Sequence, residues 1–183
     1  ETSCLSIKRK MNPMSEQSLL HQRYKTMRSD NLHAEFKNDP QLWHHYHQLS
    51  EQNELSRSLS SDVMIPRNQI INELNKIQTR RQRLVVDMGC GRAEISLHFE
   101  SDPRFKFINY DHVSCNDRVI QCDISSIPLD KFSCDICILS LAMWGSNCVE
   151  YLNQANEVLE SNGILYICEP TKRWSLLDED DTD

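Results

Sequence analysis

Three aspartates and two glycines lie along residues 84–123 at places that suit a nucleotide-like ligand. The segment LVVDMGCGR begins with an apolar run typical of a strand buried on both faces, and it ends in a glycine-rich turn. Two later strand-like segments follow the same pattern, because FKFINYD ends in an aspartate and VIQC is followed by one. Since open α/β sheets bind ligands at the carboxyl ends of their strands, we expect one shared site. Its residues are Asp87, Gly89, Gly91, Asp111 and Asp123.

The later carboxylates suit a nucleoside. Asp111 follows Gly91 by 20 residues, a position from which a carboxylate can accept hydrogen bonds from both ribose hydroxyls. Asp123 and the next backbone N–H can address the edge of an adenine. As an alternative, the aspartates could only cap helices and turns, and Asp87 could mainly hold the glycine turn in shape.

The glycine turn departs from a dinucleotide-binding site. That site has the pattern GxGxxG, in which the third glycine allows close packing and a pyrophosphate lies at the helix N-terminus. Here the third position is Glu94, whose carboxylate is bulky and would repel a diphosphate. A cofactor with an amino acid end and no phosphate tolerates this residue. The pattern therefore favours S-adenosyl-L-methionine over NAD.

Hydrophobic periodicity predicts the elements that position these residues. Upstream, Asp39 can cap a helix that begins at Pro40, and a second helix is expected over residues 66–77. From Leu84 onward, short strands alternate with helices, which predicts the α/β class with a Rossmann-like, mostly parallel sheet. Strands are expected at about 84–88, 105–110, 118–122, 134–140 and 164–168, helices at about 92–100 and 147–160, and a turn at 161–163.

Composition divides the chain into four segments. We expect a flexible basic arm over 1–34, a helical N-terminal extension over 35–83, a Rossmann-like cofactor-binding domain over 84–174 and an acidic tail over 175–183. The net charge is +4 before Leu84 and −11 from Leu84 onward. The basic N-terminal part can therefore contact RNA, although a solvated arm without a partner explains the charge equally well.

Composition also bears on the cellular compartment. No run of about 18 apolar residues is present, and the first residues lack the apolar core of a secretion signal, so we expect no membrane partner. The eight cysteines are scattered, which indicates reduced thiols in an intracellular protein. Cys134 and Cys137 form a CxxC within a strand-like run, where residues three apart point to opposite faces. We therefore expect no metal site.

Three longer segments resemble one protein family. DMGCGRAEIS, FINYDHVSCNDRVIQCDISSIPL and DICILSLAMWGSNCVEYLNQANEVLESNGILYICEPTKRW are similar to the nucleolar ribosomal-RNA-processing methyltransferases, the family that includes nucleomethylin. The similarity covers about residues 35–174, and SLAMWGSN with the upstream WxxYH segment is its most particular part. The resemblance implies a class I enzyme of the nucleus and nucleolus that uses S-adenosylmethionine to methylate N1 of an adenine in large-subunit ribosomal RNA.

The resemblance also implies cofactor contacts for particular residues. Ser140 stands where relatives have cysteine, so a backbone contact is expected there. His47 lies on the upstream helix rather than on the sheet, and an ordinary surface histidine is the alternative. The implied contacts are His47, Gly89, Asp111, Asp123, Ile124 and Ser140.

No catalytic residue can be assigned, and the chemistry explains why. Adenine N1 has an in-plane lone pair, so no base must remove a proton before it attacks a sulfonium methyl, and catalysis is mostly alignment. The base must be unstacked to expose N1, and Trp144 lies where class I enzymes meet it, although Trp144 could instead serve packing. Class I enzymes usually have seven strands, and the C-terminal ones are missing from the five expected here. The alternatives are a non-catalytic S-adenosylmethionine-binding module of a chromatin or ribosome-assembly complex, and a small-molecule or protein methyltransferase.

Overall fold

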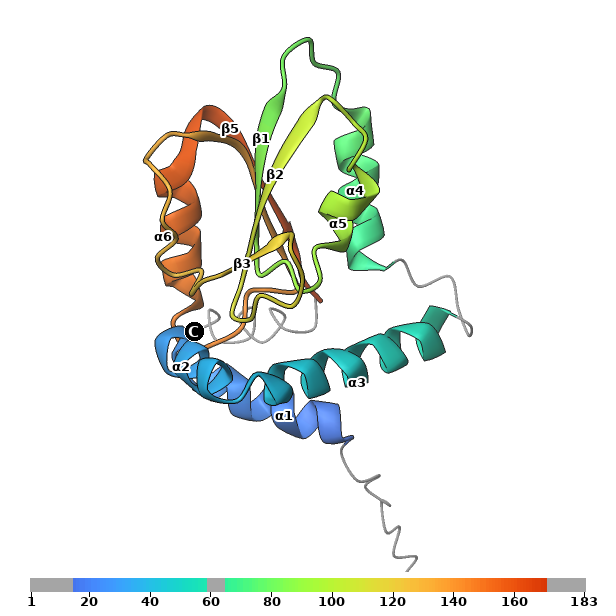
Figure 1. The fold of residues 1–183 in the computed structure, drawn as a ribbon, viewed down its shortest axis with the longest axis vertical. Coiled ribbons are helices and arrows are strands. Elements are labelled where there is room, and N and C mark those ends of the chain that lie inside the picture. Colours follow the sequence, from blue (N-terminus) through green and yellow to red (C-terminus); the bar gives the residue numbers. More distant parts are fainter. Residues whose placement is uncertain (1–14, 59–64, 171–183) are drawn as a thin grey trace, which may run out of the picture.

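The computed structural model describes residues 15–58 and 65–170, and it has a central sheet with helices on both sides (Figure 1). Three helices lie together across one end of the sheet, two helices cover one face and one helix covers the other (Figure 1). The helices are α1 (Glu16–Thr26), α2 (Ser29–Asn38), α3 (Pro40–Ser58), α4 (Pro66–Lys76), α5 (Glu94–His98) and α6 (Cys148–Val158). The strands are β1 (Arg83–Met88), β2 (Phe105–Asp111), β3 (Val119–Gln121), β4 (Cys134–Ser140) and β5 (Leu159–Cys168).

The sheet has the order β3-β2-β1-β4-β5, and all four strand pairs are parallel. This arrangement confirms the predicted Rossmann-like α/β fold. The chain moves outward from β1 to β3 and then returns to the other side of β1 with β4. The strand order therefore reverses between β1 and β4, and in such sheets the crevice beside the carboxyl ends of those two strands is the usual ligand site.

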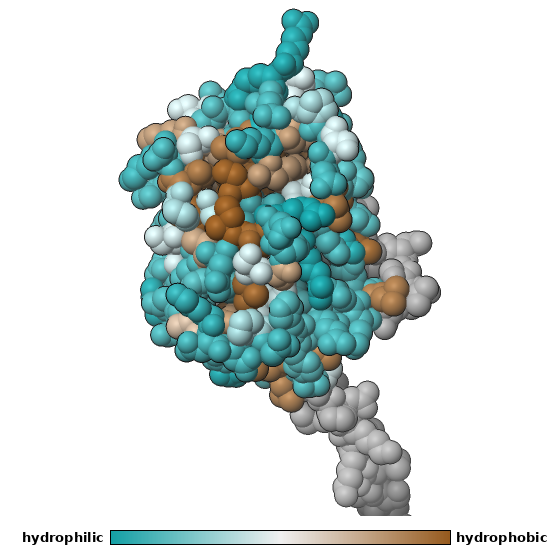
Figure 2. Space-filling view, viewed as in Figure 1, coloured by the Kyte–Doolittle hydropathy of each residue, from teal (hydrophilic) through white to brown (hydrophobic). Residues whose placement is uncertain are grey.

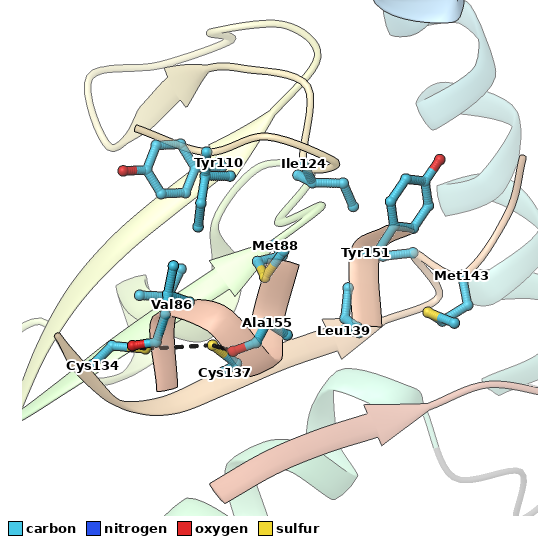
Figure 3. Close-up of a cluster of buried hydrophobic side chains, with 13 residues drawn as sticks. Val86, Met88, Tyr110, Ile124, Cys134, Cys137, Leu139, Met143, Tyr151 and Ala155 are labelled. Atoms are coloured by element: carbon cyan, nitrogen blue, oxygen red, sulfur yellow. Dashed lines mark hydrogen bonds between the residues drawn. The ribbon is translucent and has the colours of Figure 1, made fainter. Parts of the chain in front are cut away.

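Burial on both faces explains the apolar run in β1. Val85 packs with α4 residues such as Leu74, and both side chains are completely buried. Val86 faces the other way and packs with β4 and α6 side chains such as Leu139 and Ala155 (Figure 3). Because helices cover both faces, successive residues of β1 are apolar rather than alternating. Hydrophilic side chains cover most of the outer surface in the view of Figure 2, with a hydrophobic patch in its upper half.

The expectation of a flexible arm over residues 1–34 is wrong for residues 15–34, which form α1 and most of α2. Ser15 caps α1, because its Oγ accepts a hydrogen bond from the backbone N–H of Ser18 at 3.2 Å. Tyr24, Leu32 and Phe36 are buried in a cluster with the side chains of α3. Few apolar residues make these contacts, so the periodicity in the sequence is weak. Residues 1–14 lie outside the described part of the chain.

The predicted helix start at Pro40 is confirmed, and the Asp39 carboxylate accepts a hydrogen bond from the backbone N–H of Gln41 at 3.1 Å. No helix within 15–58 or 65–170 is long and apolar enough to cross a membrane. The same residues contain five strands, and β5 lies at one edge of the sheet. The expected acidic tail at 175–183 falls outside the described residues.

The two cysteines of the CxxC do not point to opposite faces, which corrects the expectation. Their sulfurs lie 3.5 Å apart, and both are buried in the cluster beneath α6 (Figure 3). The pairing of β4 with β5 is irregular at this point, since Cys134 pairs with Leu159 whereas Ile136 pairs with Ile164. This irregularity breaks the alternation of the pleat. The turn expected at 161–163 is part of the same irregularity, and Asn162 there has a φ of 70°.

Candidate functional site

A cleft opens at the carboxyl ends of the strands, where α3 lies across them. It is the place where the reversal of strand order predicts a ligand. Seven of the eight residues expected to bind the cofactor line this cleft. They are His47, Asp87, Gly89, Gly91, Asp111, Ile124 and Ser140.

The glycine turn between β1 and α5 has little space for a side chain at either of its glycines. Gly89 has a φ of +81°, and a Cβ there would lie 2.6 Å from the Cβ of Ala142. Gly91 has a φ of +59°, and a Cβ there would lie 3.3 Å from Cε1 of His47. The backbone N–H groups of Gly89 and Cys90 both donate to the Tyr110 carbonyl, at 2.8 and 3.0 Å. The turn is therefore fixed to β2 and exposes bare backbone to the cleft.

Asp87, the second-last residue of β1, is a buried carboxyl group that forms no ion pair with the described residues. Its side chain is 1% exposed, and its Oδ1 has no hydrogen-bond partner within the described residues. Burial, together with the nearby Asp111 carboxylate, raises the pKa of Asp87 to about 7. A buried polar atom without a partner is costly, and a cationic group placed beside it would remove that cost. The site therefore fits a ligand with an ammonium group.

Asp111 is almost fully engaged by the chain itself. Its Oδ2 accepts a hydrogen bond from the backbone N–H of Gly91 at 2.7 Å. Its Oδ1 accepts two more at 2.7 Å, from the indole N–H of Trp43 and from the backbone N–H of His112. Burial raises the pKa of Asp111 to about 6, although these hydrogen bonds oppose the rise. The carboxylate is thus positioned rigidly beside the glycine turn.

Asp123 is the one expected site residue that does not line the cleft. Its carboxylate accepts hydrogen bonds from the Ser29 hydroxyl at 2.9 Å and from the backbone N–H of Ser125 at 3.0 Å. Ser29 also bonds Asn147 twice, since its N–H donates to Oδ1 and its Oγ accepts from Nδ2, both at 2.9 Å. The start of α2 therefore joins the loop after β3 to the start of α6. The following residue, Ile124, does line the cleft and is 5% exposed.

His47 reaches the cleft from α3, as the family resemblance implied. Its ring packs on the indole of Trp43, with 3.9 Å between the centroids, and its edge lies over Gly91. Burial and the nearby Arg92 lower the pKa of His47 to about 3. The imidazole is therefore neutral at physiological pH. Ser140, the last residue of β4, also lines the cleft and is partly exposed.

Ion pairs at the rim of the cleft join segments that are far apart in the sequence. Arg67 at the start of α4 binds Glu54 of α3 and Glu94 of α5, the latter at 2.7 Å. Arg92 of the glycine turn binds Glu51 of α3. All five side chains line the cleft, and sequence reasoning placed only Glu94 near the site. No local pattern indicates such contacts, because the two members of each ion pair lie on different elements.

Trp144 lies in the cleft wall but packs against the N-terminal helices. Its ring stacks on Tyr46 of α3 and on His21 of α1, with centroids 5.0 and 5.5 Å away. The Tyr46 hydroxyl and Nδ1 of His21 lie 3.1 Å apart, within hydrogen-bond distance, so the two rings form a joined surface against the indole. These contacts favour the packing role for Trp144 over stacking on a target base.

The chain matches a family model described as a hypothetical methyltransferase over residues 5–179. It is 34% identical to ribosomal RNA-processing protein 8 of Arabidopsis thaliana over 76% of this chain and 45% of that protein. It is 28% identical to the 25S rRNA (adenine(645)-N(1))-methyltransferase of Schizosaccharomyces pombe over 82% of this chain and 48% of that protein.

A solved structure of a putative S-adenosylmethionine-dependent methyltransferase from Methanococcus maripaludis superposes with a TM-score of 0.48 and 19% identity, over 64% of this chain and 60% of that chain. The chain spans about half the length of the curated relatives it matches. The family match nevertheless covers almost all of the present sequence. The chain therefore belongs to the methyltransferase family that this model describes, and ribosomal RNA-processing proteins are among its relatives.

Proposed function

We propose that this chain carries the cofactor site of a methyltransferase that modifies N1 of an adenine in large-subunit ribosomal RNA. The observation that carries the proposal is the partnerless, buried Asp87 oxygen beside the bare backbone of Gly89, at the reversal of strand order. Relatives from Schizosaccharomyces pombe and Saccharomyces cerevisiae are named as 25S rRNA adenine-N1 methyltransferases. The cleft and the family thus favour the same chemistry.

Each part of the cleft suits one part of S-adenosylmethionine. Asp87 would pair with the ammonium of the methionine end, because its Oδ1 has no partner in the part of the chain that the structure describes. Asp111 would hold the ribose, and the buried Ile124 would pack against the adenine. The bare backbone at Gly89 allows close approach between these ends. When bound, the cofactor supplies an electrophilic methyl group on a sulfonium.

The chain contributes positioning rather than proton transfer. Adenine N1 can attack without losing a proton, and the methylated base can remain cationic. His47 stays neutral, since its pKa is about 3, so it adds no positive charge next to a sulfonium. The carboxylates of the cleft favour positive charge. Alignment of the nucleophile, the methyl carbon and the sulfur is then the main source of rate.

The RNA contacts of this chain are proposed for the basic residues of its N-terminal part. Two of the cations in α1 and just after it already bind carboxylates, Arg23 with Glu35 and Arg28 with Glu150. Lys25 and Lys37 are exposed and are better candidates for phosphate contacts. We place the protein in the nucleolus, where ribosomal RNA is processed. Partners from a ribosome-assembly complex or from chromatin could bind the protein while its cleft holds the cofactor.

Binding and transfer assays separate the candidate functions. Calorimetry with S-adenosylhomocysteine, the demethylated product, is expected to detect binding that Asp111→Ala removes while the circular dichroism spectrum is retained. Labelled methyl transfer is then compared on ribosomal RNA, histones and a small-molecule extract. Transfer to RNA, located at an adenine by primer extension, supports the proposal. Binding without any transfer would instead identify a non-catalytic cofactor-binding module, and transfer to histones or small molecules would contradict the RNA assignment.

A further inference from the structure

Trp43 is hydrogen-bonded to Asp111, the carboxylate that the proposed function assigns to the ribose. Its indole N–H donates to Asp111 Oδ1 at 2.7 Å, and its side chain is 2% exposed. Trp43 is the one side chain, among those that the structure describes, whose hydrogen bond to Asp111 is observed. The other donors are backbone N–H groups, that of Gly91 in the glycine turn and those of His112 and Val113, which directly follow β2.

The hydrogen-bonding capacity of Asp111 limits what else it can bind. A carboxylate oxygen has about two lone-pair sites in the carboxylate plane. Oδ1 already accepts from both Trp43 and His112, and the carboxylate has two further backbone donors in Gly91 and Val113, so Oδ1 has no free site. A ribose diol that uses both oxygens therefore requires Oδ1 to release one donor. The backbone N–H of His112 cannot leave without distorting β2, whereas an indole can move with its helix.

Trp43 is connected to the rest of the cleft through α3. One turn further along this helix, His47 packs on the indole and lies over Gly91. Beyond it, Glu51 and Glu54 bind Arg92 and Arg67 at the rim. Movement of Trp43 away from Asp111 would therefore also change the contacts of the helix that covers the glycine turn.

We propose that Trp43 competes with the cofactor for Asp111. In the absence of cofactor, the indole N–H satisfies the buried carboxylate and holds α3 across the cleft. In the complex, a ribose hydroxyl takes the place of the indole on Oδ1, and Trp43 moves aside together with this part of α3. Trp43 thereby sets the cofactor affinity without being required for the chemistry. The inference rests on the proposed cofactor site.

The substitution Trp43→Phe tests the competition by the sign of its effect. Phenylalanine retains an aromatic ring in the cluster but has no N–H to donate. We expect S-adenosylhomocysteine to bind the variant about tenfold more tightly in calorimetry, the size expected from removing one competing hydrogen bond to a charged acceptor. Tyr24→Phe is the matched control, because Tyr24 is buried in the same cluster and does not line the cleft. Unchanged or weaker binding by a folded Trp43→Phe variant would overturn the proposal.

A measurement on the unmodified protein does not depend on whether the variant folds. The indole ¹H–¹⁵N signal of Trp43 should be protected from solvent exchange without ligand, because the group is buried against Asp111. Saturation with S-adenosylhomocysteine is expected to shift this signal and to accelerate its exchange at least tenfold. A signal that keeps its position and protection at saturation would show that Trp43 stays on Asp111 in the complex, and would refute the competition.

The same experiments distinguish this inference from the proposed function. Binding by the wild type with an unmoved Trp43 signal would leave the cofactor assignment intact and remove only the competition. Binding of S-adenosylhomocysteine by Trp43→Phe but not by the wild type would support both the cofactor site and the competition, because the indole would then exclude the ligand. Absence of binding by both proteins would overturn both.

Discussion

The buried Asp87 carboxyl group is predicted to lose its own contribution to stability as the pH rises through neutrality. The pKa of Asp87 is raised from 3.8 to about 7 in the folded protein, so the folded state holds this proton more tightly than the unfolded state does. The resulting stabilisation is complete below about pH 4 and disappears as the pH rises through about 7. A pKa difference of this size corresponds to about 4 kcal/mol.

Asp87→Asn should therefore stabilise the protein without cofactor, because asparagine has nearly the same size and no charge. Urea denaturation measures the unfolding free energy of the variant and of the wild type at each pH. We expect the difference between them, in favour of the variant, to be about 3 kcal/mol larger at pH 8 than at pH 5. The same variant should lose most of its affinity for S-adenosylhomocysteine, since it lacks the charge that pairs with the ammonium. Stability and binding would then change in opposite directions at one residue.

Asp135→Asn is the control with the opposite sign. Burial opposes ionisation of Asp135, but its ion pairs with Arg83 and Arg81 prevail and lower its pKa to about 2. Its stabilisation is present above about pH 4 and is lost only as the pH falls toward 2. Asp135→Asn should thus destabilise the protein at both pH 5 and pH 8, by similar amounts.

Proton release on binding gives a further check of the Asp87 argument. With a pKa of about 7, Asp87 is about half protonated at pH 7 in the free protein. Pairing with an ammonium lowers its pKa, so binding should release about half a proton, seen as a calorimetric heat that depends on the ionisation enthalpy of the buffer. An equal pH dependence of stability in wild type and Asp87→Asn, or equal ligand affinity, would refute the reasoning.

Two further substitutions test the positioning of the cleft. Gly89→Ala should destabilise the protein by about 2 kcal/mol or more and abolish cofactor binding, because its Cβ would lie 2.6 Å from that of Ala142 at a φ of +81°. Thermal melting measures the stability, and calorimetry measures the binding. A melting temperature and an affinity close to those of the wild type would contradict the close approach. Ser29→Ala should lower the free energy of unfolding by about 1–3 kcal/mol, because it leaves Asp123 and Asn147 with fewer hydrogen-bond partners. A decrease of less than about 0.5 kcal/mol would show that this link between α2, the loop after β3 and α6 contributes little to stability.

The sequence by itself determined the sheet and the main features of the cleft. The apolar run of β1, the glycine turn and the aspartate at the end of β2 are local patterns, and the parallel sheet follows from the alternation of strands and helices. The five strands and the helices α3 to α6 therefore appear close to their expected positions. Asp87 and Asp111 line one cleft because parallel strands end at the same edge.

Only the tertiary structure decided which groups pair within that framework. The sequence indicated neither that α1 and α2 pack on α3 nor that Trp43 binds Asp111, because each contact joins segments whose local patterns are unrelated. The shared face of Cys134 and Cys137 depends on an irregularity between β4 and β5, which a strand pattern does not reveal. Periodicity reports which side chains one element buries, whereas the partner of each polar group is fixed only when distant elements pack together.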